Sequence, residues 1–165
     1  MRLFTAIPLP VPVRRRLTDL TEHQLEGVRW QKQQQLHITL KFLGNTSVNE
    51  LQSLVNALSQ IHQPAFTMNI RGIGCFPERG RPKIIWAGIS NPRQLIRLHH
   101  RIEETCTNLG FEAEDRPFKP HITLGRAKEW SRQDVLSFIN QHRQFSIPGV
   151  AAKEFVLYES KLRPG

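Results

Sequence analysis

The sequence contains few cysteines and no long apolar segment. Its 165 residues include two cysteines, Cys75 and Cys106, and neither stands in a Cys-x-x-Cys or other metal-ligand spacing. We therefore expect two free, partly buried thiols in a reducing compartment. No stretch approaches the ~20 apolar residues that cross a bilayer, and the first residues lack the layout of a signal peptide. These absences predict a soluble, cytoplasmic protein without membrane contact.

Acidic residues are also scarce. The chain has 14 Asp and Glu against 23 Lys and Arg, which gives a formal net charge of +9. Such a surplus is typical of a protein that binds a polyanion, with nucleic acid as the first candidate, although a basic surface can also serve solubility alone. The length favours one domain over residues 1–165, with room for two lobes inside it.

One tetrad is present twice. The run His-Ile-Thr-Leu occupies residues 37–40 and again residues 121–124, so the two histidines lie 84 positions apart. Side chains alternate along a strand, so each His and Thr would share one face while Ile and Leu share the other. The apolar face can anchor the strand in a core and hold the polar pair at a fixed height. Two such strands brought together would form a site containing His37, Thr39, His121 and Thr123.

This set of side chains has a chemical interpretation. The pKa of imidazole lies near neutrality, so one histidine can act as a base and the other as an acid at the same pH. In-line cleavage of a phosphoester needs a base for the attacking water and an acid for the departing oxygen. It also needs donors for the non-bridging oxygens, and Thr39 and Thr123 are candidates for that role.

Three other interpretations remain open. A single His-x-Thr strand is often only structural, although a structural repeat would preserve Ile and Leu without needing His and Thr. The two histidines could ligate zinc, but threonine is a poor ligand and no Asp or Glu lies in phase with either tetrad, although a distant carboxylate could fold in. A module that binds RNA phosphate without turnover would also fit the charge. We expect no metal and no cofactor.

The paired motifs resemble those of the 2H phosphoesterase superfamily, and within it the RNA 2′,3′-cyclic phosphodiesterases, which are also named RNA 2′-5′ ligases. Residues 2–7, 36–44, 116–126 and 155–160 are similar to that subfamily too, so the resemblance covers nearly the whole chain. It implies an α+β fold of two pseudo-symmetric lobes, each an antiparallel sheet backed by helices, with a central groove that carries both motifs. One departure is that members usually continue into a further strand, whereas this chain stops at Gly165.

The resemblance also implies a reaction. Terminal 2′,3′-cyclic phosphates on RNA would be opened to 2′-phosphates without a metal, with His121 as the base on water and His37 as the acid at the leaving 3′ oxygen. In reverse, the same site could join a 5′ hydroxyl to a cyclic phosphate through a 2′-5′ linkage. We expect a monomer whose partner is RNA with a cyclic phosphate end or a small cyclic nucleotide.

Phe42, Phe118 and Arg126 are candidate substrate contacts. Phe118 lies between two prolines, in a loop where an aromatic ring could stack on a base or could equally belong to the core. Arg126 would share the apolar strand face of the second tetrad if the strand were regular. A break at Gly125 could redirect Arg126 toward the groove and a phosphate.

Periodicity places these motifs on a mixed order of elements. Strands are expected at residues 2–8, around each tetrad, and at 66–76, 83–88 and 152–160. Helices are expected from about residue 13 to 20, after a capping box at residues 47–50, and at 95–109 and 131–141. Residues 77–82 read as a hairpin loop whose arginines could touch a polynucleotide backbone. This order favours the α+β class.

Overall fold

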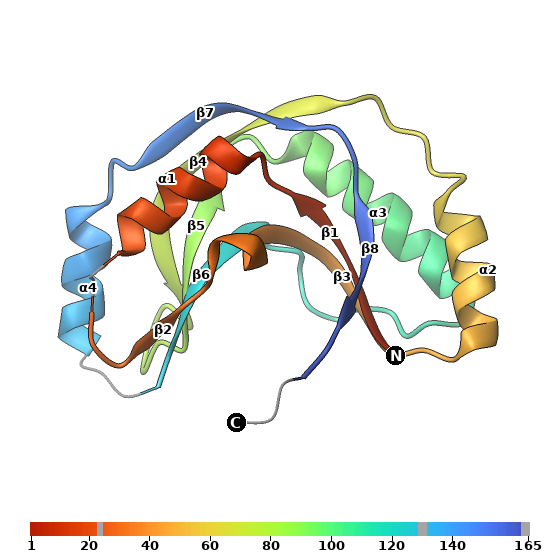
Figure 1. Ribbon diagram of the computed structural model, residues 1–165, viewed down its shortest axis with the longest axis horizontal. Helices are drawn as coiled ribbons and strands as arrows, with labels where there is room; N and C mark the ends of the chain where they lie inside the picture. The colour runs from red at the N-terminus through yellow and green to blue at the C-terminus, as the bar shows by residue number, and fades with distance from the viewer. Residues whose placement is uncertain (23–24, 129–131, 163–165) are drawn as a thin grey trace.

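The computed structural model describes residues 1–22, 25–128 and 132–162 (Figure 1). The strands are β1 (Arg2–Pro8), β2 (Val28–Trp30), β3 (His37–Asn45), β4 (Phe66–Phe76), β5 (Ile84–Ile89), β6 (His121–Ala127), β7 (Ser146–Ala152) and β8 (Val156–Ser160). The helices are α1 (Val11–Thr21), α2 (Val48–Leu58), α3 (Arg93–Asn108) and α4 (Arg132–Gln141), with one 3-10 turn, η1 (Gln33–Gln35). The α+β class is thus confirmed. None of the helices in the described ranges is long and apolar enough to span a membrane.

The strands of the described ranges form one antiparallel sheet. Its order is β7-β4-β5-β6-β3-β1-β8, and β2 pairs with β6 beside this path. Between β3 and β6 the ladder consists of Ile38 opposite Ile122, one residue from each tetrad. The two expected lobes are therefore the halves β7-β4-β5-β6 and β3-β1-β8, which are joined edge to edge where the repeated motifs meet.

Two of the helices, α1 and α3, cross over between the two halves. Figure 1 shows α1 and α4 beside the half that contains β4 to β6, and α2 and α3 beside the half that contains β1, β3 and β8. Arg16 of α1 donates a hydrogen bond to Ser146 O at the start of β7, 3.3 Å away. α1 follows β1 but packs beside the half that contains β4 to β6, and α3 follows β5 but packs beside the half that contains β1, β3 and β8. Each half that carries a motif strand is therefore covered in part by a helix that follows a strand of the other half.

The apolar residues of both tetrads form the centre of the core. Ile38 and Ile122 are completely buried, and the two tetrad leucines are nearly so. Burial of a Leu or Ile side chain stabilises a fold by about 1.5–3 kcal/mol. The apolar face of each motif strand is therefore fixed firmly, as the alternating pattern predicts.

Each motif strand contains a β-bulge at the leucine of its tetrad. Between β1 and β3 the register passes from Ala6 opposite Thr39 to Thr5 opposite Lys41, and Leu40 is skipped. Between β5 and β6 it passes from Trp86 opposite Thr123 to Ile85 opposite Gly125, and Leu124 is skipped. A bulge adds one residue to one strand, so the side chains that follow it change face.

The structure also differs from the expected elements at several places. The polar residues 31–35, whose composition predicts a flexible approach to the first tetrad, contain the 3-10 turn η1, and the strand β2 just before them was not expected. The single strand expected over residues 152–160 is instead the end of β7, a break at 153–155 and then β8. In α2, the helical spacing of apolar residues predicts Val48 and Val55 on the buried stripe, but they are 76% and 45% exposed. The expected first residue of the last helix, Ser131, and the chain end at residues 163–165 lie outside the described ranges.

Candidate active site

All four polar side chains of the tetrads line one groove. The groove has a volume of about 720 Å³. Its walls also contain the three candidate substrate contacts, Phe42, Phe118 and Arg126. The structure therefore brings together all seven residues that the sequence singled out, although they come from segments some 80 residues apart.

The pair formed by Ile38 and Ile122 fixes how the two motifs face each other. In an antiparallel ladder this register sets His37 opposite Thr123, and Thr39 opposite His121. Side chains directly opposite each other share a face and have Cβ atoms about 4.5–5.5 Å apart. Because the two isoleucines point into the core, the imidazoles and hydroxyls share the groove face. Each histidine thus lies beside a threonine of the other motif.

The two imidazole rings have different hydrogen-bond partners. Nδ1 of His121 lies 2.7 Å from the carbonyl oxygen of Lys119, two residues earlier. A carbonyl only accepts, so Nδ1 of His121 must carry the proton and Nε2 of its neutral ring is the acceptor. Nε2 of His37 lies 3.1 Å from Thr39 Oγ1. In both rings Nε2, the atom that can take or give a proton, is therefore free of a backbone partner among the described residues.

Burial lowers the pKa of both histidines below 6.5. For His37, burial is the main cause, the bond to Gln35 opposes it, and the nearby positive charge of His121 lowers the pKa further. For His121, burial again dominates over the bond to Lys119, and the positive charge of Arg126 adds to the lowering. Both rings are therefore mainly neutral at pH 7 in the free protein. A bound anion would raise both pKa values, since an opposite charge favours the protonated form.

The bulges direct Arg126 and Phe42 into the groove. Each is the second residue after the bulged leucine, and each lies on the groove wall. Phe42 is 71% exposed, with its ring centroid 5.8 Å from that of Phe4. The redirection of Arg126 anticipated from Gly125 is therefore present, and its cause is the bulge at Leu124.

Phe118 forms a wall of the groove and also packs against the core. Its ring lies flat on that of His99, with centroids 3.9 Å apart and planes at 10°. The His99 ring donates through Nδ1 to Leu40 O, 2.9 Å away, on the bulged residue of the first motif. The core interpretation of Phe118 thus holds in part, because His99 covers one side of its ring, whereas stacking of a base on this residue stays a prediction.

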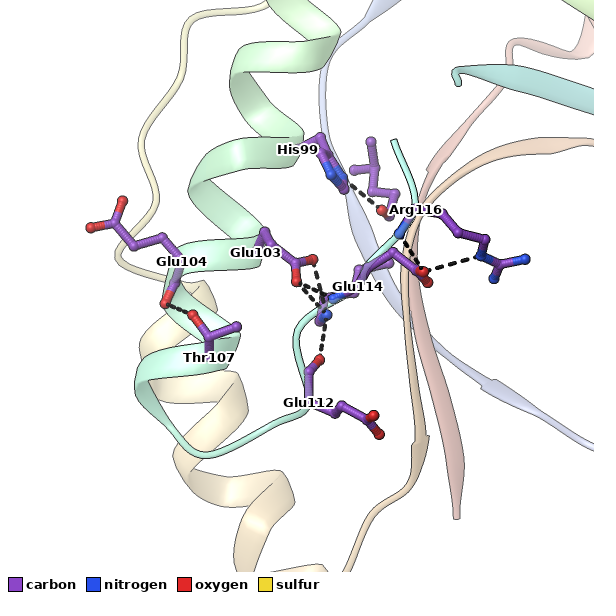
Figure 2. Close-up of polar contacts among 9 residues, drawn as sticks. His99, Glu103, Glu104, Thr107, Glu112, Glu114 and Arg116 are labelled. Carbon is purple, nitrogen blue, oxygen red and sulfur yellow. Dashed lines mark hydrogen bonds and ion pairs between the residues drawn. The ribbon is translucent and has the colours of Figure 1, made fainter. Parts of the chain in front are cut away.

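A buried ion pair that the sequence did not reveal supports the same wall. Lys41 Nζ bonds both carboxylate oxygens of Glu103 on α3, and also Glu112 O at 3.0 Å. Figure 2 shows Glu103 facing the segment that carries Glu112 and Glu114, and the backbone N–H of Glu114 donates to Glu103 at 2.9 Å. These bonds tie the segment before His121 to the strand that carries His37. The only sequence signal was a lysine directly after the first tetrad.

The described residues offer no clear metal site. Within residues 1–22, 25–128 and 132–162, no three His, Cys, Asp or Glu side chains gather in a way that could hold a metal ion. The two cysteines are buried, and burial raises the pKa of Cys106 to about 11. Thiolate chemistry is therefore not available from this thiol near neutral pH.

Known proteins match the chain over almost its whole length. A relative from Archaeoglobus fulgidus, named RNA 2′,3′-cyclic phosphodiesterase, is 30% identical over 166 residues, which cover 99% of this chain and 93% of the relative. One of the same name from Methanocaldococcus jannaschii is 32% identical and is covered to 94%. The crystal structure of E. coli LigT complexed with 3′-AMP has a TM-score of 0.79 and 30% identity, with 99% of this chain and 90% of that chain covered.

The sequence model of the family described as LigT like Phosphoesterase matches residues 7–86 and 88–165. The match includes both His-x-Thr tetrads, and among the strands it leaves out only residues 2–6 of β1 and Ala87 of β5. The expected membership of the 2H phosphoesterases is thereby confirmed, and the chain belongs to the LigT like phosphoesterase family.

Proposed function

We propose that the protein hydrolyses 2′,3′-cyclic phosphate ends of RNA to 2′-phosphates. The observation that carries this proposal is the register at Ile38 and Ile122, which supports a site with two oriented imidazoles and two hydroxyls on one face. The family and the names of the relatives support the same activity. A net charge of +9 suits a polyanionic substrate.

In the proposed step, Nε2 of neutral His121 takes a proton from water, and the water oxygen forms a bond to phosphorus. The bond from phosphorus to the 3′ oxygen breaks, and protonated His37 gives its proton to that oxygen. The products are a 3′ hydroxyl and a 2′-phosphate, and a proton exchange with solvent restores both rings. Thr39 and Thr123 donate to the non-bridging oxygens as negative charge develops on them.

With the lowered pKa values, His121 can act as the base and His37 as the acid only when substrate is bound. A base must be neutral, and burial keeps His121 neutral near pH 7. An acid must be protonated, and the negative phosphate raises the pKa of His37 when it enters the groove. The assignment of acid and base follows the family resemblance, and the reverse reaction would join a 5′ hydroxyl to the cyclic phosphate.

Substrate contacts are proposed for the two residues that the bulges expose. Phe42 presents an open aromatic ring on which a base can stack. Arg126 lies close enough to His121 to affect its pKa, so its guanidinium can contact a phosphate held between the histidines. Because one chain supplies both motifs, a monomer of one domain is sufficient for the reaction.

Phosphorus NMR of 2′,3′-cyclic AMP incubated with the protein tests the proposal. The cyclic phosphate signal should be replaced by that of the 2′-phosphate, and turnover should persist in excess EDTA, since imidazoles and hydroxyls supply the chemistry. His37→Ala and His121→Ala should each lose about 10²–10⁴-fold in rate. His62→Ala is the matched control, because His62 is exposed and lies outside the groove. Binding without turnover would instead support a phosphate-binding module, and activity that needs added zinc would contradict the metal-free scheme.

A further inference from the structure

Two aromatic rings lie beside His37. Phe4 of β1 is directly opposite Tyr158 of β8 in the sheet, and their rings stack with centroids 5.2 Å apart and planes at 18°. The centroid of the Phe4 ring lies 5.3 Å from that of the His37 imidazole, with planes at 33°. The Tyr158 ring lies 6.2 Å from the same imidazole, with planes at 25°. The three rings therefore form one cluster with nearly parallel planes.

The backbone register explains how His37 reaches these rings. Side chains alternate along β1, so Phe4, Ala6 and Pro8 share the face that lines the groove. His37 is opposite Pro8 in the ladder between β1 and β3. Between Pro8 and Phe4, this face carries only the methyl group of Ala6, which is completely buried. The small side chain leaves room for the imidazole to lean along β1 and contact Phe4.

His121 has different surroundings. The ring of Phe76 meets the His121 imidazole edge to face, with centroids 5.0 Å apart and planes at 86°. The same Phe76 ring has Nζ of Lys119 at 6.0 Å from its centroid, so it already attracts a cation. Arg126 adds a further positive charge, which lowers the pKa of His121. Two histidines with identical neighbours in the sequence thus differ in their neighbours in space.

The carboxylates of the groove are not available to a protonated His37. Among the described residues that line the groove, the carboxylates are those of Glu103 and Glu114. Glu103 is paired with Lys41 at 2.9 Å, and Glu114 with Arg116 at 3.1 Å. An imidazolium at position 37 therefore needs another source of stabilisation in the free protein.

The aromatic cluster can supply that stabilisation. An aromatic face attracts a cation that lies within about 6 Å of its centroid, and the Phe4 ring is within this distance of His37 while Tyr158 is just beyond it. Burial raises the pKa of the Tyr158 hydroxyl, so this residue stays neutral near pH 7 and acts through its ring. The positive charge of His121, on the neighbouring strand β6, opposes protonation of His37, and Arg126 and Lys119 line the groove on that side.

We infer that Phe4 and Tyr158 are positioning residues, which hold the imidazole of His37 and favour its protonated form so that His37 serves as the acid. The inference rests on the proposed function for the role of His37. It gives a structural cause for a division of roles that two identical tetrads cannot provide. His121, beside the charge of Arg126, is left as the neutral base.

NMR titration of the histidine ring protons in the free protein tests the inference without substrate. Phe4→Leu keeps an apolar side chain but removes the aromatic face, so the midpoint of His37 should fall by about 0.4–0.7 pH units, while that of His121 should not fall. Burial is the main cause that lowers the pKa of His37, so a ring that only excluded water would give the opposite sign on removal. A rise of the His37 midpoint, or no change, would overturn the inference.

Variants at Tyr158 test the second ring independently. Tyr158→Leu should lower the His37 midpoint in the same direction but by less, because Tyr158 lies further away, whereas Tyr158→Phe retains the ring and should retain the midpoint. Phe155→Leu is the matched control, since Phe155 is also half-buried, packs against the core and lies outside the groove. Equal movement of the His37 midpoint in Tyr158→Leu and Phe155→Leu would remove Tyr158 from the cluster's role.

The pH profile of kcat on 2′,3′-cyclic AMP separates support of the acid from contact with substrate. In Phe4→Leu the falling limb should move to lower pH, so that kcat above it drops by about 2.5-fold to 5-fold, while the rising limb stays in place. A lost substrate contact would lower the whole profile without moving either limb, and would contradict the inference. If the wild type hydrolyses no cyclic phosphate, the proposed function fails, and the NMR midpoints still decide whether the two rings favour protonated His37.

Discussion

Lys41 and Glu103 form an ion pair of 2.9 Å in which the lysine side chain is 2% exposed and the glutamate 19%. The lysine directly follows the first tetrad in the sequence. The bulge at Leu40 turns its side chain toward α3. Lys41 also donates to Glu112 O, and Glu103 accepts from the backbone N–H of Glu114, so both partners bond to the segment that leads to His121. The pair therefore links the two motifs through α3.

The unequal burial of this pair predicts unequal effects of removing each partner. Glu103→Gln leaves a charged lysine buried without a counter-ion and should destabilise the fold by about 3–5 kcal/mol. Lys41→Met leaves a glutamate that water can reach, and should cost about 1–3 kcal/mol. Urea denaturation of both variants checks the order. A larger loss for Lys41→Met would contradict the account.

The same pair predicts a dependence of stability on pH. Burial by itself would raise the pKa of Glu103, but the bonds from Glu114 N–H and Lys41 outweigh it, and the pKa lies below 4.5. A carboxyl with a depressed pKa stabilises the fold above its unfolded pKa, and this contribution is lost as the pH falls through the folded value. The difference in stability between wild type and Glu103→Gln should thus be full near pH 7 and shrink below about pH 4.5. A difference in stability between the two proteins that grows toward acid pH would be inconsistent with a lowered pKa of Glu103.

The lowered histidine pKa values predict an effect of phosphate. In the free protein, NMR titration of the ring protons should give midpoints below 6.5 for His37 and His121, because burial disfavours the charged form. Inorganic phosphate should raise both midpoints. His99, whose pKa is also lowered mainly by burial but which is covered by Phe118, is the internal control and should move less. Equal movement of all three would mean that phosphate does not bind between the two motifs.

The exposed ring of Phe42 predicts that its removal weakens substrate binding and leaves the rate of the chemical step nearly unchanged. Stacking of one base on an aromatic ring contributes about 1–3 kcal/mol, so Phe42→Ala should raise KM about tenfold and leave kcat within about twofold. Val48→Ala is the control, since Val48 is similarly exposed at 76% and lies outside the groove. A fall in kcat with unchanged KM would remove Phe42 from the substrate contacts.

Local patterns were sufficient to predict most of the frame. The repeated tetrads, the capping box at Ser47 and the alternation from Phe66 onward each depend on neighbours in the sequence, and β3, β6, α2 and β4 lie where they were expected. The four polar residues of the groove were also found from the alternation alone. The change of face after each bulge could be predicted only from the register with the partner strands, although Gly125 indicated a break in β6.

Elements that depend on distant partners were not predictable. β2 has three residues and is a strand because β6 offers it a free edge. β7 contains Pro148 and Gly149, which read as breakers but are tolerated because β7 lies at the edge of the sheet. Lys41 looks like a surface charge until Glu103, 62 residues away, is placed beside it. Its role and that of His99 follow only from the packing of α3.

The most direct test of the two-histidine scheme uses a cyclic substrate whose 3′ oxygen is replaced by sulfur. Sulfur departs as a thiolate without protonation, so His37→Ala should regain most of its activity on this substrate, whereas His121→Ala should remain impaired because water still needs a base. The pH profile of His37→Ala should then keep only the limb that rises as the base deprotonates. Rescue of His121→Ala instead of His37→Ala would reverse the assignment, and rescue of neither would contradict acid and base catalysis by this pair.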